Sequence, residues 1–230
     1  MTEPRVPRLS VDIVSDVMCP WCIIGWLKFR KVMAHFEGRL DFRVQWHPFE
    51  LNPDMPREGE DAAEHVMRKY GISAEQSRVN SGKMAGVAAD LGFIFNRGPG
   101  FRMRNSFDAH RLLTWAGAME EAEQDGPTGV QTALKLALFA AHFTDNRDVG
   151  DHDVLADAAE SVGLDRERAA AILASGEFGE MVRTEEAYWA DQNITGVPAF
   201  ILGGRMLIPG AQDPDVFIRV IENKVLAAAA

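Results

Sequence analysis

Cysteine is scarce in this sequence: only two occur among 230 residues, and they stand three positions apart as Cys19 and Cys22. A secreted disulfide scaffold needs more cysteines, spread along the chain so that their bridges close loops. The low count therefore excludes such a scaffold. Two neighbouring cysteines cannot staple a whole fold, so local chemistry must explain why they are there.

Long apolar runs and an excess of basic charge are also missing. No segment approaches the apolar length that a membrane-spanning helix needs. Residues 1–8 contain two prolines and no apolar stretch of the kind found in signal peptides, so we expect a cytoplasmic protein. Acidic residues outnumber basic ones by 34 to 24, for a net charge of -10. This balance argues against nucleic acid or an anionic membrane as a partner.

The first part of the chain predicts a β–α–β unit. Residues 9–14 alternate as a strand does, and after Pro20 apolar residues recur at helical spacing. Proline suits the first turn of a helix, and Gly38 is a typical residue at the end of one. Residues 42–47 then alternate strictly and predict a second strand. The cysteines consequently lie where the first strand passes into the helix.

The rest of the chain predicts a helical block and then a return to strands. Residues 60–193 are almost entirely helical in pattern, with a short extended piece expected at 93–95. Residues 198–202 and 206–208 predict a hairpin with Gly203-Gly204 as a two-residue turn, and a last helix follows from Pro214. We expect an α/β fold with a mixed sheet flanked by helices.

The cysteine spacing favours redox chemistry. Two cysteines at i and i+3 can close a small disulfide ring at the start of a helix. There, unpaired N–H groups and the helix dipole stabilise a thiolate at Cys19, which would attack a disulfide. Cys22 would resolve the resulting mixed disulfide, and Pro20 and Trp21 would tune the redox potential.

A zinc site is the main alternative for these cysteines. Cys19 and Cys22 followed by His35 imitate the first three ligands of a zinc finger, but His47 is too distant for the usual histidine spacing. We therefore predict no bound metal. The other histidines are isolated in sequence and indicate no catalytic role.

A second motif, Thr195-Gly196-Val197-Pro198, precedes the late strand. A proline there could adopt an ordinary trans bond in a turn, or a rarer cis bond. A cis Pro198 beside Cys19 would leave the Val197 backbone free to bind an extended substrate. We therefore predict Val197 and Pro198 as substrate-binding residues.

Together these features resemble the DsbA-like thioredoxin superfamily, and several segments resemble its cytoplasmic FrnE-like branch. The supporting segments are residues 49–53, 105–106, 109–111 and 209–212. The resemblance implies a thioredoxin-like domain, discontinuous over 1–60 and 190–230, with a large all-helical insertion over 61–189 whose last helix leads back into that domain. It also implies a cis Pro198. Trp21 stands where the best-known periplasmic members carry histidine, so their strongly oxidising character is not expected here.

The function that follows is a thiol–disulfide oxidoreductase that reduces or isomerises disulfides of proteins or small molecules. It needs no cofactor beyond its own redox-active pair, although glutathione could act as a co-substrate. One alternative is a glutathione-dependent isomerase or transferase of the 2-hydroxychromene-2-carboxylate isomerase or kappa type, but those enzymes use serine where this chain has Cys19. Another is a binding module without enzymatic activity. A basic aromatic loop at 95–104 could line a substrate groove, although a solvated loop is the simpler interpretation.

Overall fold

The computed structural model describes residues 6–98, 100–122 and 129–227, so residues 1–5 of the N-terminal segment discussed above lie outside it. The strands are β1 (Arg8–Ser15), β2 (Asp41–Pro48), β3 (Glu60–Asp61), β4 (Arg102–Met103), β5 (Ala199–Leu202) and β6 (Met206–Pro209). The helices are α1 (Pro20–His35), α2 (Ala62–Tyr70), α3 (Ala74–Asp90), α4 (Phe107–Ala122), α5 (Val130–Phe143), α6 (His152–Ser161), α7 (Arg166–Ser175), α8 (Gly179–Asp191) and α9 (Pro214–Val220). A π-helical turn, Ile221–Leu226, continues α9.

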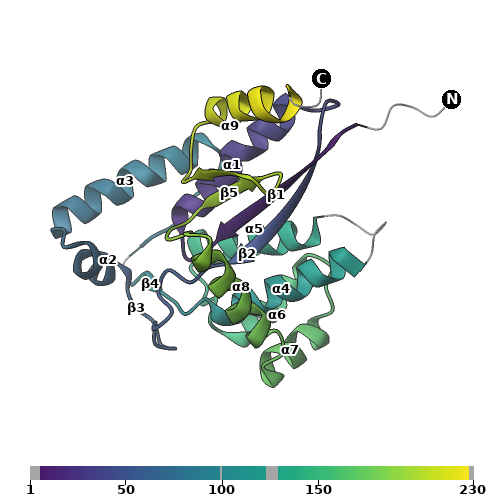
Figure 1. Ribbon diagram of the computed structural model, residues 1–230. Helices are drawn as coiled ribbons and strands as arrows, with labels where there is room; N and C mark the ends of the chain where they lie inside the picture. The colour runs from purple at the N-terminus through teal and green to yellow at the C-terminus, as the bar shows by residue number, and fades with distance from the viewer. Residues whose placement is uncertain (1–5, 99, 123–128, 228–230) are drawn as a thin grey trace.

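Four strands form a mixed sheet in the order β2-β1-β5-β6, which confirms the predicted fold class (Figure 1). β1 runs parallel to β2, and the two antiparallel pairs are β1 with β5 and β5 with β6. The parallel pair requires the crossover that α1 supplies, whereas the late hairpin needs only a tight turn. β1 is thus a central strand, and the residues that follow it enter the middle of the molecule.

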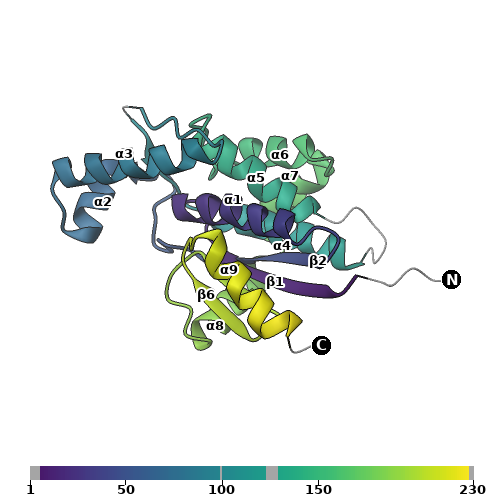
Figure 2. The ribbon, with the colours of Figure 1, turned by 90° about the horizontal axis from the view of Figure 1, so that it is seen from above.

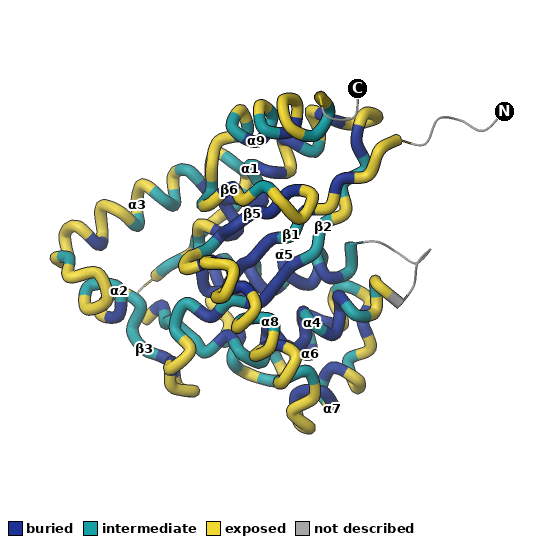
Figure 3. The backbone as a smooth tube through the Cα atoms, in the orientation of Figure 1, coloured by how far each residue is buried: buried dark blue, intermediate teal, exposed yellow. Residues whose placement is uncertain are grey.

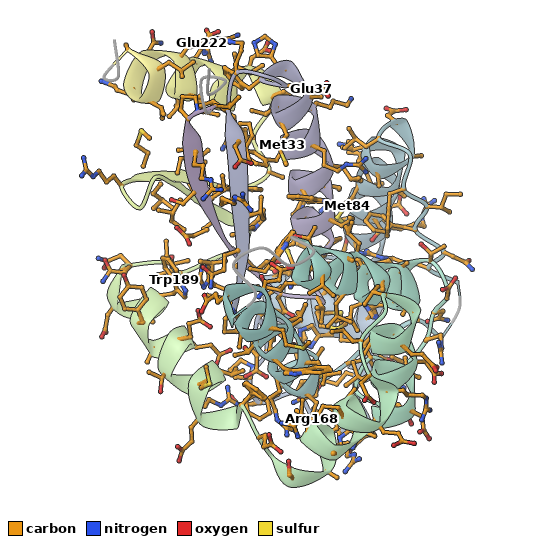
Figure 4. The ribbon with its side chains drawn as sticks, turned by 90° about the vertical axis from the view of Figure 1, so that its right-hand side faces the viewer. Met33, Glu37, Met84, Arg168, Trp189 and Glu222 are labelled. Atoms are coloured by element: carbon orange, nitrogen blue, oxygen red, sulfur yellow. The ribbon has the colours of Figure 1, made fainter. Side chains whose placement is uncertain are left out.

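Helices cover both faces of the sheet. On one face α1 and α9 pack through aromatic side chains, with Phe29 lying 5.4 Å from Phe200 and 5.3 Å from Phe217 between ring centroids. On the other face Trp189, at the end of α8, packs with Val14 (Figure 4). These apolar layers hold α1, and hence its N-terminus, firmly against the sheet.

The helical block has its own core. Buried side chains of α4 to α7 form one cluster, and two residues after β1, Val17 and Met18, belong to it. The loop between β1 and α1 therefore joins both parts of the protein. α2 and α3 extend away from the sheet instead, and much of their surface is exposed (Figures 2 and 3).

One side chain connects the helical block to the edge of the sheet. Gln131 of α5 accepts a hydrogen bond from the Trp46 N–H (2.8 Å) and donates one to the Trp46 carbonyl (2.9 Å). It also donates to the carbonyl of Leu113 (3.1 Å). A helix side chain thus occupies the position that a neighbouring strand would fill beside β2, and it satisfies backbone groups that burial would otherwise leave unpaired.

Several local predictions need correction. α1 ends at His35, before Gly38, which adopts φ +73° in the following turn. Leu202 pairs with Met206, so the hairpin loop has three residues, with Gly203 and Gly204 both at positive φ. Residues 93–95 form no strand, and the extended backbone in the insertion is the short β3–β4 pair instead. Local propensity does not reveal such pairings because distant segments create them.

Within the part of the chain that the structure describes, no helix is long and apolar enough to cross a membrane. The insertion is helical, as predicted. We retain as a proposal the division into a discontinuous domain, 1–60 with 190–230, and an insertion, 61–189, noting that α8 already packs on the sheet.

Candidate active site

The two cysteines lie at the N-terminus of α1, as predicted. Cys19 is the cap residue with an extended backbone (φ -91°, ψ 111°), and Pro20 begins the helix. Both cysteines are free thiols, and both are buried, Cys22 completely. The N–H of Cys22 donates to the carbonyl of Cys19 (3.0 Å), so the first helical turn holds the pair together.

The predicted substrate-binding residues come from the other end of the chain to the same place. The Val197–Pro198 bond is cis, and the Val197 carbonyl oxygen lies 3.6 Å from the Sγ of Cys19. Gly25 permits this approach, because a Cβ built on it would lie only 3.1 Å from Cγ of Pro198. Trp21 is 45% exposed beside the pair, on the wall of a cavity.

The two neighbouring thiols influence each other's ionisation. Burial opposes ionisation of Cys22, but hydrogen bonds from Cys19 and Ser15 and the charge of Lys135 more than offset it and lower the Cys22 pKa. The hydrogen bond with Cys22, then burial and the Cys22 charge, raise the pKa of Cys19 well above its usual value. Cys22 is thus the easier of the two thiols to ionise, which reverses the expectation that the helix N-terminus favours a thiolate at Cys19.

A buried carboxylate lies behind the pair, three residues before Cys19. Asp16 accepts hydrogen bonds from the N–H groups of Met18 (3.0 Å) and Leu51 (2.7 Å). Nε2 of His110 lies 3.5 Å from its Oδ1. Burial raises the Asp16 pKa, but the hydrogen bond and charge of His110, with these N–H groups, bring it below the usual value.

A buried lysine also lies close to the cysteine pair, and the sequence analysis did not identify it. Lys135 of α5 is fully buried, donates to the Ser15 carbonyl (3.3 Å), and lies over the rings of Trp46 and Phe139. Burial lowers its pKa to about 8, against the charges of the cysteines and Asp16, which raise it. A signal existed: Lys135 interrupts an apolar stretch of α5, where a solvated lysine is not expected.

A cavity of about 820 Å³ opens in front of Cys19. Its walls come from the α1 N-terminus, from α2 and α3, and from the loop before β4, including Arg97 and Phe101. The basic aromatic loop is therefore no simple solvated loop: Phe101 is buried and Arg97 is half-buried. This volume lies within the range of small-molecule sites, which is about 300–1,000 Å³.

The remaining histidine near the sheet takes no part in this site. His47 contacts Asp12 (3.0 Å) and Glu185 (2.5 Å) on the face that α8 covers. Among the described residues no group of three or more histidine, cysteine or acidic side chains could hold a metal ion.

Comparison with known proteins agrees with this geometry. A family model described as DSBA-like thioredoxin domain matches residues 10–222. A probable DsbA oxidoreductase from Streptomyces coelicolor is 32% identical, with a TM-score of 0.82 over 93% of this chain and 88% of that one. The uncharacterised Bacillus subtilis protein YwbO is 28% identical over 94% of this chain and 97% of its own.

A 2-hydroxychromene-2-carboxylate isomerase has a similar fold. It is 14% identical, with a TM-score of 0.68 over 96% of this chain and 98% of that one. At this identity the similarity concerns the fold alone. The residues at the site, and Cys19 first among them, must then decide between redox chemistry and isomerisation.

Proposed function

This chain belongs to the DSBA-like thioredoxin domain family, and on that basis we propose that Cys19 and Cys22 reduce or isomerise disulfides of proteins or small molecules. The observation that carries the proposal is the position of Cys19. Its thiol lies at a helix N-terminus, beside the Val197 carbonyl and at the wall of an open cavity. A thiol in that position can meet a substrate disulfide while backbone groups hold the substrate chain.

The reaction transfers two electrons from the dithiol to the substrate. Cys19 loses its proton by way of Cys22 and attacks one sulfur of the disulfide, the S–S bond breaks, and the released thiolate takes up that proton. The Cys22 thiolate then attacks the Cys19 sulfur, which releases the second substrate thiol and leaves a Cys19–Cys22 disulfide. An external thiol, for which we propose glutathione, restores the dithiol and is itself oxidised.

The buried polar groups support the resolving step. The charge of Lys135 lowers the pKa of Cys22, which raises the thiolate fraction of the residue that must attack. The Asp16 charge opposes a thiolate at Cys19. Destabilising the reduced thiolate form makes the pair a stronger reductant. Pro20 and Trp21 occupy the turn between the sulfurs, and we propose that they tune the redox potential.

We propose the cytoplasm as the location, because a reducing compartment keeps the pair as the dithiol that attacks. In that compartment reduction or isomerisation, rather than oxidation, is the expected direction. No nucleic acid, membrane or metal takes part in this scheme.

The test compares the wild type with Cys19→Ser and Cys22→Ser in the reduction of insulin and of hydroxyethyl disulfide, with glutathione as reductant. We expect Cys19→Ser to be inactive and Cys22→Ser to accumulate a mixed disulfide, detected by mass spectrometry. Full activity of Cys19→Ser would contradict the proposal. Glutathione-dependent isomerase or transferase activity that persists in Cys22→Ser would favour the isomerase type instead.

A further inference from the structure

Arg97 occupies an unusual environment in the cavity wall. Its guanidinium lies over three aromatic rings, at 4.8 Å from the centroid of Phe95, 5.1 Å from that of Phe143 and 5.3 Å from that of Phe101. These rings come from the loop before β4 and from the end of α5. They surround the guanidinium and remove part of it from water.

Among the described residues Arg97 has no acidic partner at ion-pair distance, and its Nε is buried without a hydrogen-bond acceptor. Two other basic groups of this region do not share this property. Arg104 pairs with Asp148 at 2.8 Å, and burial, with the charge of Arg97, lowers the pKa of His142 to about 3 and leaves it neutral. Burial lowers the Arg97 pKa only to about 10, so it stays charged at neutral pH.

A desolvated charge without a partner is costly, and proteins seldom keep one unless a ligand completes it. Arg97 and Cys19 both line the cavity, and a Cys19 thiolate acts on Arg97 through its charge. The guanidinium can bind a carboxylate through two parallel hydrogen bonds, which gives orientation as well as energy.

We propose that Arg97 is the anion-binding residue of this cavity, and that the substrate is a small disulfide that carries a carboxylate near its sulfur atoms. This inference rests on the proposed function and names its substrate class. A protein disulfide fits less well, because the charge is set inside a cavity of about 820 Å³ and not on the open surface.

The test uses pre-reduced protein and an excess of one disulfide, with oxidation followed through tryptophan fluorescence. Without an added thiol, no second anion competes for the cavity. The disulfides are dithiodiglycolate (two carboxylates), hydroxyethyl disulfide (neutral), cystamine (two ammonium groups) and insulin. Arg97→Gln removes the charge, and Arg78→Gln makes the same change at an exposed α3 residue outside the cavity.

We expect Arg97→Gln to raise the half-saturating concentration of dithiodiglycolate about tenfold, as loss of a charged hydrogen bond does, and to leave that of hydroxyethyl disulfide nearly unchanged. Arg78→Gln should match the wild type. The half-saturating concentration of dithiodiglycolate for Arg97→Lys should lie between those of the wild type and Arg97→Gln, because lysine keeps the charge but not the paired hydrogen bonds.

Two results would overturn the inference. One is an unchanged half-saturation for dithiodiglycolate. The other is an equal change for all the disulfides, which would mean that Arg97 acts only through the Cys19 thiolate. If oxidation of the protein by insulin depends on Arg97 as strongly as oxidation by dithiodiglycolate does, the residue serves protein substrates instead. If none of these disulfides oxidises the wild-type protein, the proposed function itself fails.

Discussion

The carbonyl oxygen of Val197 lies 3.6 Å from the Sγ of Cys19, although 178 positions separate the two residues. β5 pairs directly with β1, so the segment before β5 must lie beside the segment after β1. Sheet topology therefore brings the two halves of the site together. The contact also leaves a backbone acceptor next to the thiol, where an extended substrate would need one.

Replacing Trp21 with histidine should make the pair more oxidising. A histidine next to Cys19 stabilises the thiolate and hence the reduced form, and stabilising the reduced form raises the potential. We expect a rise of about 30 mV or more, the equivalent of a tenfold change in the equilibrium constant. Equilibration with glutathione buffers measures it. Trp21→Phe is the control and should stay near the wild type, and a fall in potential for Trp21→His would contradict this explanation.

Replacing the buried Lys135 with methionine should slow the resolving step without unfolding the protein. Loss of the positive charge raises the Cys22 pKa, and a smaller thiolate fraction slows attack on the mixed disulfide by a factor on the order of ten. An apolar side chain of similar length fits between the rings of Trp46 and Phe139, so the free energy of unfolding should not fall.

Thiolate absorbance in the Cys19→Ser background reports the Cys22 pKa, and rapid mixing reports the resolving rate. Lys31→Met changes an exposed lysine of α1 and should alter neither. An unchanged Cys22 pKa in Lys135→Met would show that the lysine has only a packing role.

His47 should make stability depend on pH. Burial lowers its pKa, but Asp12 and Glu185 more than offset this and raise it above the usual 6.5. The contribution of the charged His47 is therefore complete below pH 6.5 and is lost as pH rises through the raised pKa. His47→Gln should cost about 1–3 kcal/mol at about pH 5.5 and clearly less at about pH 8.5.

Urea unfolding at both pH values, for variant and wild type, isolates the His47 contribution because other groups cancel in the difference. His35→Gln, at a half-exposed site 3.9 Å from Glu222, is the matched control and should cost little free energy of unfolding, because solvent screens an exposed pair. An equal cost of His47→Gln at both pH values would refute the assignment.

Replacing Gln131 with leucine should destabilise the junction between sheet and helices. The change leaves the N–H and the carbonyl of Trp46 buried without partners, at about 1–3 kcal/mol for each group. We expect a total loss of about 3 kcal/mol in the free energy of unfolding, measured with urea. Gln45→Leu is the control, because Gln45 bonds Glu121 at the exposed surface and should cost little. Similar losses for the two variants would be inconsistent with the role of Gln131 at the strand edge.

Several features of the fold could be predicted because local chemistry determines them. The alternation at 9–14 and 42–47 corresponds to β1 and β2, and Pro20 begins α1 as its fixed φ favours. The cis Pro198 followed from resemblance, not from local physics. The end of α1 and the length of the hairpin loop were misjudged, because competing turn geometries differ by little energy.

The sequence by itself determined the pair of cysteines, its place at a strand-to-helix junction, and the order of the four strands of the main sheet, because spacing and periodicity are local properties. Only the tertiary structure decided what surrounds the pair. Lys135 and His110 belong to helices more than 90 residues away from Asp16 in sequence. The sequence alone indicates a solvated loop residue at Arg97, and only the fold places aromatic rings around it. Burial and charge at a site come from segments that meet in space, and no local pattern records which segments will meet.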